Sequence, residues 1–143
     1  MAQAHRRLRS AKELQRLMQW HYASIRLPRL GRPLAWVTSG APVELLRAAG
    51  VVAVYPENYG ALCGAQHQAV ALCQKAESEG YSPDLCSYAR TSLGSVIAPE
   101  SAPLGGLPRP DLLIACNNIC STVVKWYETL SDRLRYALTE YYR

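Results

Sequence analysis

Two cysteines each stand where an apolar, strand-like run gives way to a helix-like run. Cys86 lies in GYSPDLCSYARTSLG, and Cys120 lies in PRPDLLIACNNICSTVVKWYE. The first N–H groups of a helix have no partner within the helix and carry a partial positive charge, which favours a thiolate over a thiol. The thiolate is the form of cysteine that binds metal ions. The pattern therefore predicts two metal ligands, Cys86 and Cys120, at comparable positions of the fold.

The other three cysteines, Cys63, Cys73 and Cys116, occur in apolar surroundings, where a lone cysteine commonly packs as a small hydrophobic residue. Cys116 and Cys120 form a C-x3-C pair, so a structural zinc site built from Cys86, Cys116 and Cys120 is an alternative, although it lacks a fourth ligand. Without a signal-peptide-like start, five cysteines are not expected to form a disulfide framework.

The chain is also expected to be cytoplasmic. No apolar run approaches the ~20 residues that a membrane-spanning helix needs, and no signal-peptide core follows the start. Its 143 residues are 49% apolar and 19% charged, the composition of a folded domain. No glycine-rich phosphate loop, Walker loop or Ser-His-Asp pattern is present, so nucleotide binding through those motifs has no support.

Positive charge is concentrated in a basic N-terminal helical segment, residues 1–33. Residues 1–32 contain eight Arg or Lys and one acid, Glu13, whereas 33–143 contain eight bases and ten acids. Such a segment could meet nucleic acid, an anionic membrane or an acidic partner subunit. The basic residues are not interleaved with the patterns of nucleic-acid modules, so we interpret them as the solvated face of an amphipathic helix. We expect neither a nucleic-acid nor a membrane partner.

Apolar periodicity and turn residues predict alternating strands and helices. Strands are expected at 34–37, 51–55 and 111–115. Helices are expected from a capping box at 10–13 to Pro28, from Pro42 to Gly50, over 59–79, after Cys86, from Ser121 through Leu130, and again over 132–143, with a loop over 97–110. This alternation predicts an α/β fold in a single domain, 34–143: an open parallel sheet with helices on both faces, a Rossmann-like three-layer arrangement.

Ligands of open parallel sheets bind at the carboxyl ends of the strands. The loops expected there are 38–42, 55–60 and 116–120. Ser39, Glu57 and Asn58 are candidate substrate-binding residues in these loops, although Ser39 could instead start the turn or cap the next helix, and Glu57 and Asn58 could be turn formers. Arg90 could compensate the charge of a metal centre or pair with Asp84.

Four longer segments occur in one order and spacing: APVELLRAAG (41–50), VYPENYGALCGA (54–65), EGYSPDLCSYART (79–91) and LLIACNNICSTVVKWYE (112–128). Together they resemble the N-terminal part of a subunit of the 2-hydroxyacyl-CoA dehydratase / benzoyl-CoA reductase family. The resemblance implies a [4Fe–4S] cluster held by three cysteines of each subunit, two of which match Cys86 and Cys120. The third would come from a second α/β domain downstream, which we expect to be missing here, so that the chain is a fragment or a truncated member.

The same resemblance implies an oxygen-sensitive, radical enzyme of anaerobic metabolism. Its substrate would be an acyl-CoA or aryl-CoA thioester, and its reaction either a dehydration, which is a lyase reaction, or a ring reduction, which is an oxidoreductase reaction. It also implies a paralogous partner subunit and an ATP-dependent activator iron–sulfur protein. The alternative, from a different class, is a non-catalytic α/β remnant that keeps the fold and a subunit interface.

Overall fold

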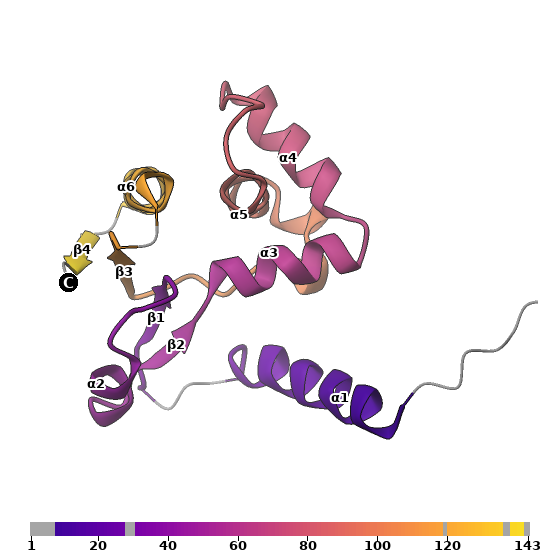
Figure 1. The fold of residues 1–143 in the computed structure, drawn as a ribbon, viewed down its shortest axis with the longest axis vertical. Helices are drawn as coiled ribbons and strands as arrows, with labels where there is room; N and C mark the ends of the chain where they lie inside the picture. The colour runs from indigo at the N-terminus through magenta and orange to yellow at the C-terminus, as the bar shows by residue number, and fades with distance from the viewer. Residues whose placement is uncertain (1–7, 28–30, 119, 136–137, 142–143) are drawn as a thin grey trace, which may run out of the picture. The chain divides into compact units, whose positions relative to one another are not determined.

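Four parallel strands form one open sheet in the order β2-β1-β3-β4 (Figure 1). The structure, a computed structural model, describes residues 8–27, 31–118, 120–135 and 138–141. The strands are β1 (Leu34–Val37), β2 (Val52–Val54), β3 (Leu112–Cys116) and β4 (Leu138–Tyr141). The helices are α1 (Arg9–Ser24), α2 (Val43–Ala48), α3 (Pro56–Ala65), α4 (Ala69–Ser78), α5 (Ser87–Ile97) and α6 (Ser121–Leu134).

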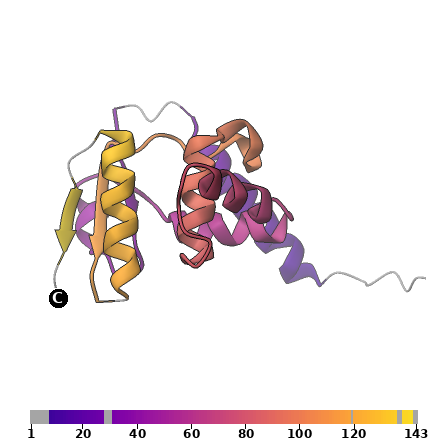
Figure 2. The same cartoon turned by 90° about the horizontal axis from the view of Figure 1, so that it is seen from above.

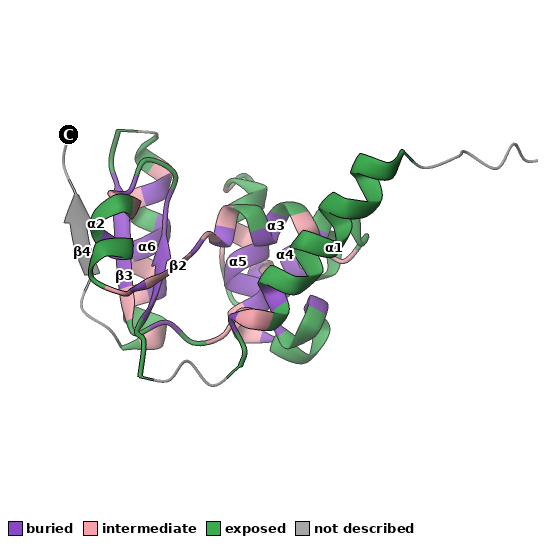
Figure 3. Ribbon diagram, turned by 90° about the horizontal axis from the view of Figure 1, so that it is seen from below, coloured by how far each residue is buried: buried purple, intermediate pink, exposed green. Residues whose placement is uncertain are grey.

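Helices cover both faces of this sheet. On one face, Val37 and Ile114 pack with Leu46 of α2 in a buried apolar cluster. Because successive strand residues point to opposite faces, Trp36 and Leu113 point to the other face of the sheet, which α6 covers. Figures 1 and 2 show α6 running along the sheet on the side opposite α2, and Figure 3 shows the central strands β1 and β3 largely buried. The predicted α/β fold, with a parallel sheet between two helical layers, is confirmed.

Local sequence signals account for the first half of the sheet. The four residues of β1 are all buried, as expected for a central parallel strand. The turn after it contains Gly40, which has a φ of 85°, a backbone conformation that favours glycine. Pro42 is the N-cap of α2 rather than its first helical residue, and Gly50 follows the helix with a φ of 72°. The strand and helix predicted here are confirmed to within one or two residues.

The stretch predicted as one helix over 59–79 is two helices, α3 and α4. His67, with a φ of 58°, lies in the left-handed region between them, where a helix cannot continue. The loop expected over 55–60 is also wrong, because α3 already begins at Pro56. Proline suits that first position, where no N–H is needed and its fixed φ matches the helix.

The C-terminal segment differs from the helix predicted over 132–143. Helix α6 ends at Leu134, Arg135 adopts a left-handed conformation with a φ of 56°, and β4 then pairs in parallel with β3. Leu113 is opposite Leu138, so the last described strand extends the sheet. The unpaired edge of β3 offers N–H and C=O groups with which this segment can form a strand. The helical spacing of its apolar residues gives no sign of that pairing. Residues 136–137 and 142–143 of the predicted helix lie outside the described residues.

The chain divides into two compact units, Met1–Gly31 and Arg32–Arg143. In the first unit, α1 begins after Leu8 without a side-chain cap, so the capping box predicted at Ser10 is wrong: Ser10 lies inside the helix. The helix ends at Ser24, and Pro28, its predicted end, lies outside the described residues. None of the helices in the described ranges combines the length and apolar character required to cross a membrane.

Candidate functional site

A cleft of about 380 Å³ opens where β1, β2 and β3 end. It is lined by all five residues predicted from the sequence to bind metal or substrate: Ser39, Glu57, Asn58, Cys86 and Cys120. The rest of its wall consists of residues that the sequence did not nominate as ligands: Ala61, Tyr88, Thr122, Val123 and Trp126. The carboxyl edge of the sheet thus gathers the candidate side chains at one place, as the topology predicts. Their roles remain predictions.

Both nominated cysteines are helix N-caps. Cys86 precedes α5 and Cys120 precedes α6, so their predicted placement at helix starts is confirmed. The strand-like run predicted before Cys86 is wrong, because a turn precedes it, whereas β3 precedes Cys120. Both are exposed free thiols. Neither helix has a side-chain cap hydrogen bond or an acidic residue in its first turn. The first N–H groups and the positive ends of two helices are therefore left for a negatively charged group in the cleft.

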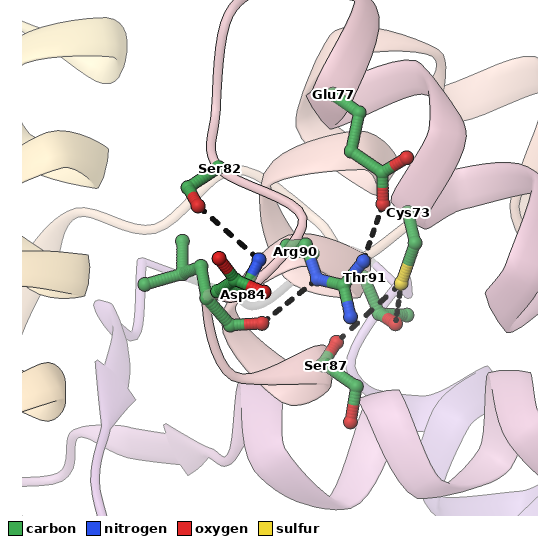
Figure 4. Close-up of polar contacts among 8 residues, drawn as sticks. Cys73, Glu77, Ser82, Asp84, Ser87, Arg90 and Thr91 are labelled. Carbon is green, nitrogen blue, oxygen red and sulfur yellow. Dashed lines mark hydrogen bonds and ion pairs between the residues drawn. The ribbon is translucent and has the colours of Figure 1, made fainter.

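A polar network holds the segment that leads into Cys86 (Figure 4). The Arg90 Nε donates a hydrogen bond to the carbonyl oxygen of Leu85 at 2.8 Å, and its guanidinium forms an ion pair with Glu77 of α4. The alternative partner expected for Arg90, Asp84, is wrong, because the guanidinium pairs with Glu77 instead. The turn before Cys86 is also held by the Asp84 backbone N–H, which donates to Ser82 Oγ at 3.2 Å. Arg90 thus fixes the residue immediately before the thiol.

Ser39 and Glu57 interact directly across the mouth of the cleft. The Oγ of Ser39 donates to Oε2 of Glu57 at 2.6 Å, and the Ser39 backbone N–H donates to the same oxygen at 3.1 Å. Ser39 is therefore a turn residue bonded to α3, and the expectation that it caps α2 is wrong. Glu57 and Asn58 lie in the first turn of α3 rather than in a loop. Because Oε2 accepts both bonds, the other carboxylate oxygen is left for a ligand.

The remaining cysteines are buried, as the sequence predicts. Cys116 ends β3, where its N–H donates to Thr38 Oγ1 at 2.8 Å and its Sγ donates to Asn118 Oδ1 at 2.9 Å. Within the described parts of the chain, no three His, Cys, Asp or Glu side chains are grouped so that they could hold a metal ion. The structural zinc site from Cys86, Cys116 and Cys120 is therefore wrong. The cleft offers two thiols, which fit part of a thiolate ligand set.

Burial raises the pKa of the Cys63 thiol from its usual value of 9.0 to about 11. An unfolded chain would release this proton near the usual pKa, whereas the folded protein retains it. The corresponding stability is therefore fully present below pH 9.0 and is lost as the pH rises towards about 11, by up to about 2–3 kcal/mol. Urea unfolding near each end of this range should show a larger loss for the native chain than for Cys63→Ala.

Burial also raises the pKa of the Tyr127 hydroxyl, which would add to the loss of stability at high pH. Because Tyr127 is present in both proteins, the difference between the native chain and Cys63→Ala reports on the Cys63 thiol alone. Equal losses of stability in the two proteins would contradict the assignment.

Trp126 is a cleft residue that the sequence analysis did not nominate. It is 3% exposed, yet it forms part of the cleft wall, and its indole Nε1 has no hydrogen-bond partner among the described residues. Its place in the cleft could have been predicted from its spacing to Cys120. Cys120, Val123 and Trp126 are three residues apart, which places them on one side of α6. The missing partner of the indole N–H could not be read from the sequence.

Together, the fold and the cleft define a parallel α/β protein with a two-thiol site at the carboxyl edge of its sheet. Residues 38–142 match the family described as "2-hydroxyglutaryl-CoA dehydratase, D-component", and the chain belongs to this family.

Among the curated relatives, the (R)-2-hydroxyisocaproyl-CoA dehydratase alpha subunit of Clostridioides difficile is 45% identical over 104 residues, which are 73% of this chain and 25% of that protein. The lactoyl-CoA dehydratase subunit alpha of Anaerotignum propionicum is 37% identical over 117 residues (73% and 28%). A benzoyl-CoA reductase subunit of Thauera aromatica is 32% identical over 91 residues (61% and 20%). The chain therefore spans about a quarter of the length of these relatives.

Proposed function

We propose that the chain is the cluster-binding, N-terminal part of a subunit of a 2-hydroxyacyl-CoA dehydratase or benzoyl-CoA reductase. One observation carries this proposal: two exposed thiols, each the N-cap of a helix, line the same cleft. Thiolates ligate iron–sulfur clusters, and a thiolate-ligated cluster is stabilised by nearby N–H donors. The uncapped first turns of α5 and α6 are suitable donors.

In this proposal, Cys86 and Cys120 hold a [4Fe–4S] cluster, and a third ligand comes from the second domain of a complete subunit. The described residues offer no third ligand of their own. The cluster, when bound, supplies a low-potential electron for radical dehydration or ring reduction. Arg90 is a positioning residue, because it orients the segment before Cys86 through Leu85 and Glu77.

The substrate proposed for the cleft is a CoA thioester. Ser39 and Glu57 face it as a bonded pair, and Asn58 follows Glu57 in the first turn of α3. With Oε2 held by Ser39, the Oε1 of Glu57 can accept a hydrogen bond from a hydroxyl of the substrate. A paralogous partner subunit and an ATP-dependent activator iron–sulfur protein would complete the system, which we assign to the cytoplasm. The names of the relatives, which are subunits, support a partner.

Iron and acid-labile sulfide analysis after anaerobic reconstitution of this chain tests the proposal, with electron paramagnetic resonance to identify the cluster. Near-stoichiometric [4Fe–4S] would support a site nucleated by Cys86 and Cys120. A chain that is folded by circular dichroism but binds neither iron nor sulfide would instead support the second candidate, a non-catalytic α/β scaffold. That candidate is favoured by the presence of only two thiols at the described cleft.

A further inference from the structure

One polar group in the wall of the cleft has no partner. The Nε1 of Trp126 is buried and has no hydrogen-bond partner within the described parts of the chain. Buried polar groups in folded proteins almost always have a partner, so each exception calls for an explanation. Helical side chains lean towards the N-terminal turn, which for Trp126 is the turn of Thr122 and Val123. Both of those residues also line the cleft, so the indole lies on the cleft side of α6.

The second tryptophan of the same unit, Trp36, provides a comparison for the hydrogen bonding of a buried indole. Trp36 is just as buried, at 2% exposed, but its Nε1 donates to the carbonyl oxygen of Pro108 at 3.1 Å. The protein itself therefore satisfies the buried indole that lies away from the cleft. Among the described residues it leaves unsatisfied the indole that lines the cleft, as it also leaves the hydroxyl of the neighbouring Tyr127. The Trp126 Nε1 is itself fully buried, so an acceptor bound in the cleft reaches it only after a small shift of the cleft wall.

We propose that the indole N–H of Trp126 donates a hydrogen bond to the 2-hydroxyl oxygen of an acyl-CoA bound in the cleft. This inference rests on the proposed function, and it adds a residue that decides between 2-hydroxyacyl and plain acyl thioesters. A hydroxyl group has one hydrogen to donate and can accept two. It can therefore donate to Oε1 of Glu57 and accept from Trp126 at the same time. An acyl chain without the hydroxyl would leave the indole N–H unsatisfied, and sites of this kind discriminate strongly against such analogues.

Two substitutions on one helix separate this role from a structural one. Trp126→Phe removes the N–H and keeps an aromatic ring. Tyr127→Phe is the control, because the Tyr127 hydroxyl is also buried without a partner among the described residues and does not line the cleft, although the charge of Glu57 acts on it. Each protein would be labelled with ¹⁵N and titrated with (R)-2-hydroxyisocaproyl-CoA and with isocaproyl-CoA, which lacks only the hydroxyl. Nuclear magnetic resonance detects such binding even when it is weak.

In the native chain, the indole resonance of Trp126 should move downfield with the hydroxy thioester and stay in place with isocaproyl-CoA. The preference for the hydroxy thioester should be roughly tenfold. It should vanish in Trp126→Phe and persist in Tyr127→Phe. The indole shift is measured in the native protein, so it stands even if Trp126→Phe fails to fold.

If both thioesters bind and Trp126→Phe keeps the preference, or if the indole responds equally to both, this inference is overturned while the proposed function stands. If neither thioester perturbs any resonance of the cleft, the acyl-CoA assignment fails and the inference fails with it. The iron analysis of the Cys86 and Cys120 site is independent of either outcome.

Discussion

Cys86→Ala and Cys120→Ala are each expected to reduce the iron and sulfide bound after anaerobic reconstitution to the background level. The described cleft offers only these two thiols, and each substitution leaves a single sulfur that cannot hold a cluster by itself. The first turns of α5 and α6 keep their N–H groups in both variants, so the loss would report on ligation rather than on the electrostatic setting. Iron, sulfide and the paramagnetic resonance signal of the reduced protein provide the measurement.

The matched control for both variants is Cys73→Ala. Cys73 does not line the cleft, but its Sγ lies 3.4 Å from Thr91 Oγ1 and 3.8 Å from the carbonyl oxygen of Ser87, both in α5. The control therefore disturbs the neighbourhood of the Cys86 helix without removing a proposed ligand, and it should bind as much iron as the native chain. Normal iron content in Cys86→Ala or Cys120→Ala, with native circular dichroism, would remove the ligand assignment.

The thiol pair could be predicted because its signal is local. A Pro-Asp pair precedes each cysteine and a helix follows it, and these local features predict that Cys86 and Cys120 are N-caps. The apolar run before Cys120 is strand β3, whereas the segment before Cys86 is a turn. The pairing of Arg90 could not be predicted in this way. Asp84 is its nearer neighbour in sequence, but Glu77 reaches it from a different helix, thirteen residues away. Contacts between helices depend on packing that a single sequence does not display.

The same limit explains the errors in the fold. The predicted strand at 34–37 and the helix after Pro42 follow from β-branched and apolar residues, proline and glycine acting at short range. Strand β4 instead depends on the exposed edge of β3, a partner more than twenty residues earlier in the chain. The break at His67 places a non-glycine residue in a left-handed conformation, which histidine adopts more often than most residues but still uncommonly, so its presence alone does not predict a break.

Gly94→Ala is expected to destabilise the protein by about 3 kcal/mol, at the upper end of the usual cost of overpacking. Gly94 lies in α5 where that helix meets α4, and a methyl group there would overlap the Leu72 carbonyl oxygen and lie 2.6 Å from its carbonyl carbon. The obstacle is helix backbone, which cannot rotate aside as a side chain can. The two helices would have to separate. Urea unfolding followed by circular dichroism measures the loss.

Gly64→Ala provides the opposite expectation from the same chemical change. Gly64 lies in α3, and a methyl group there would meet nothing within 4 Å. Alanine is the better helix former, so this variant should gain about 0.5–1 kcal/mol. A Gly94→Ala protein as stable as the native chain would show that α4 and α5 do not approach so closely. If the loss is found, iron binding should fall as well, because α5 carries Cys86 at its N-cap and the close approach at Gly94 sets where that helix lies.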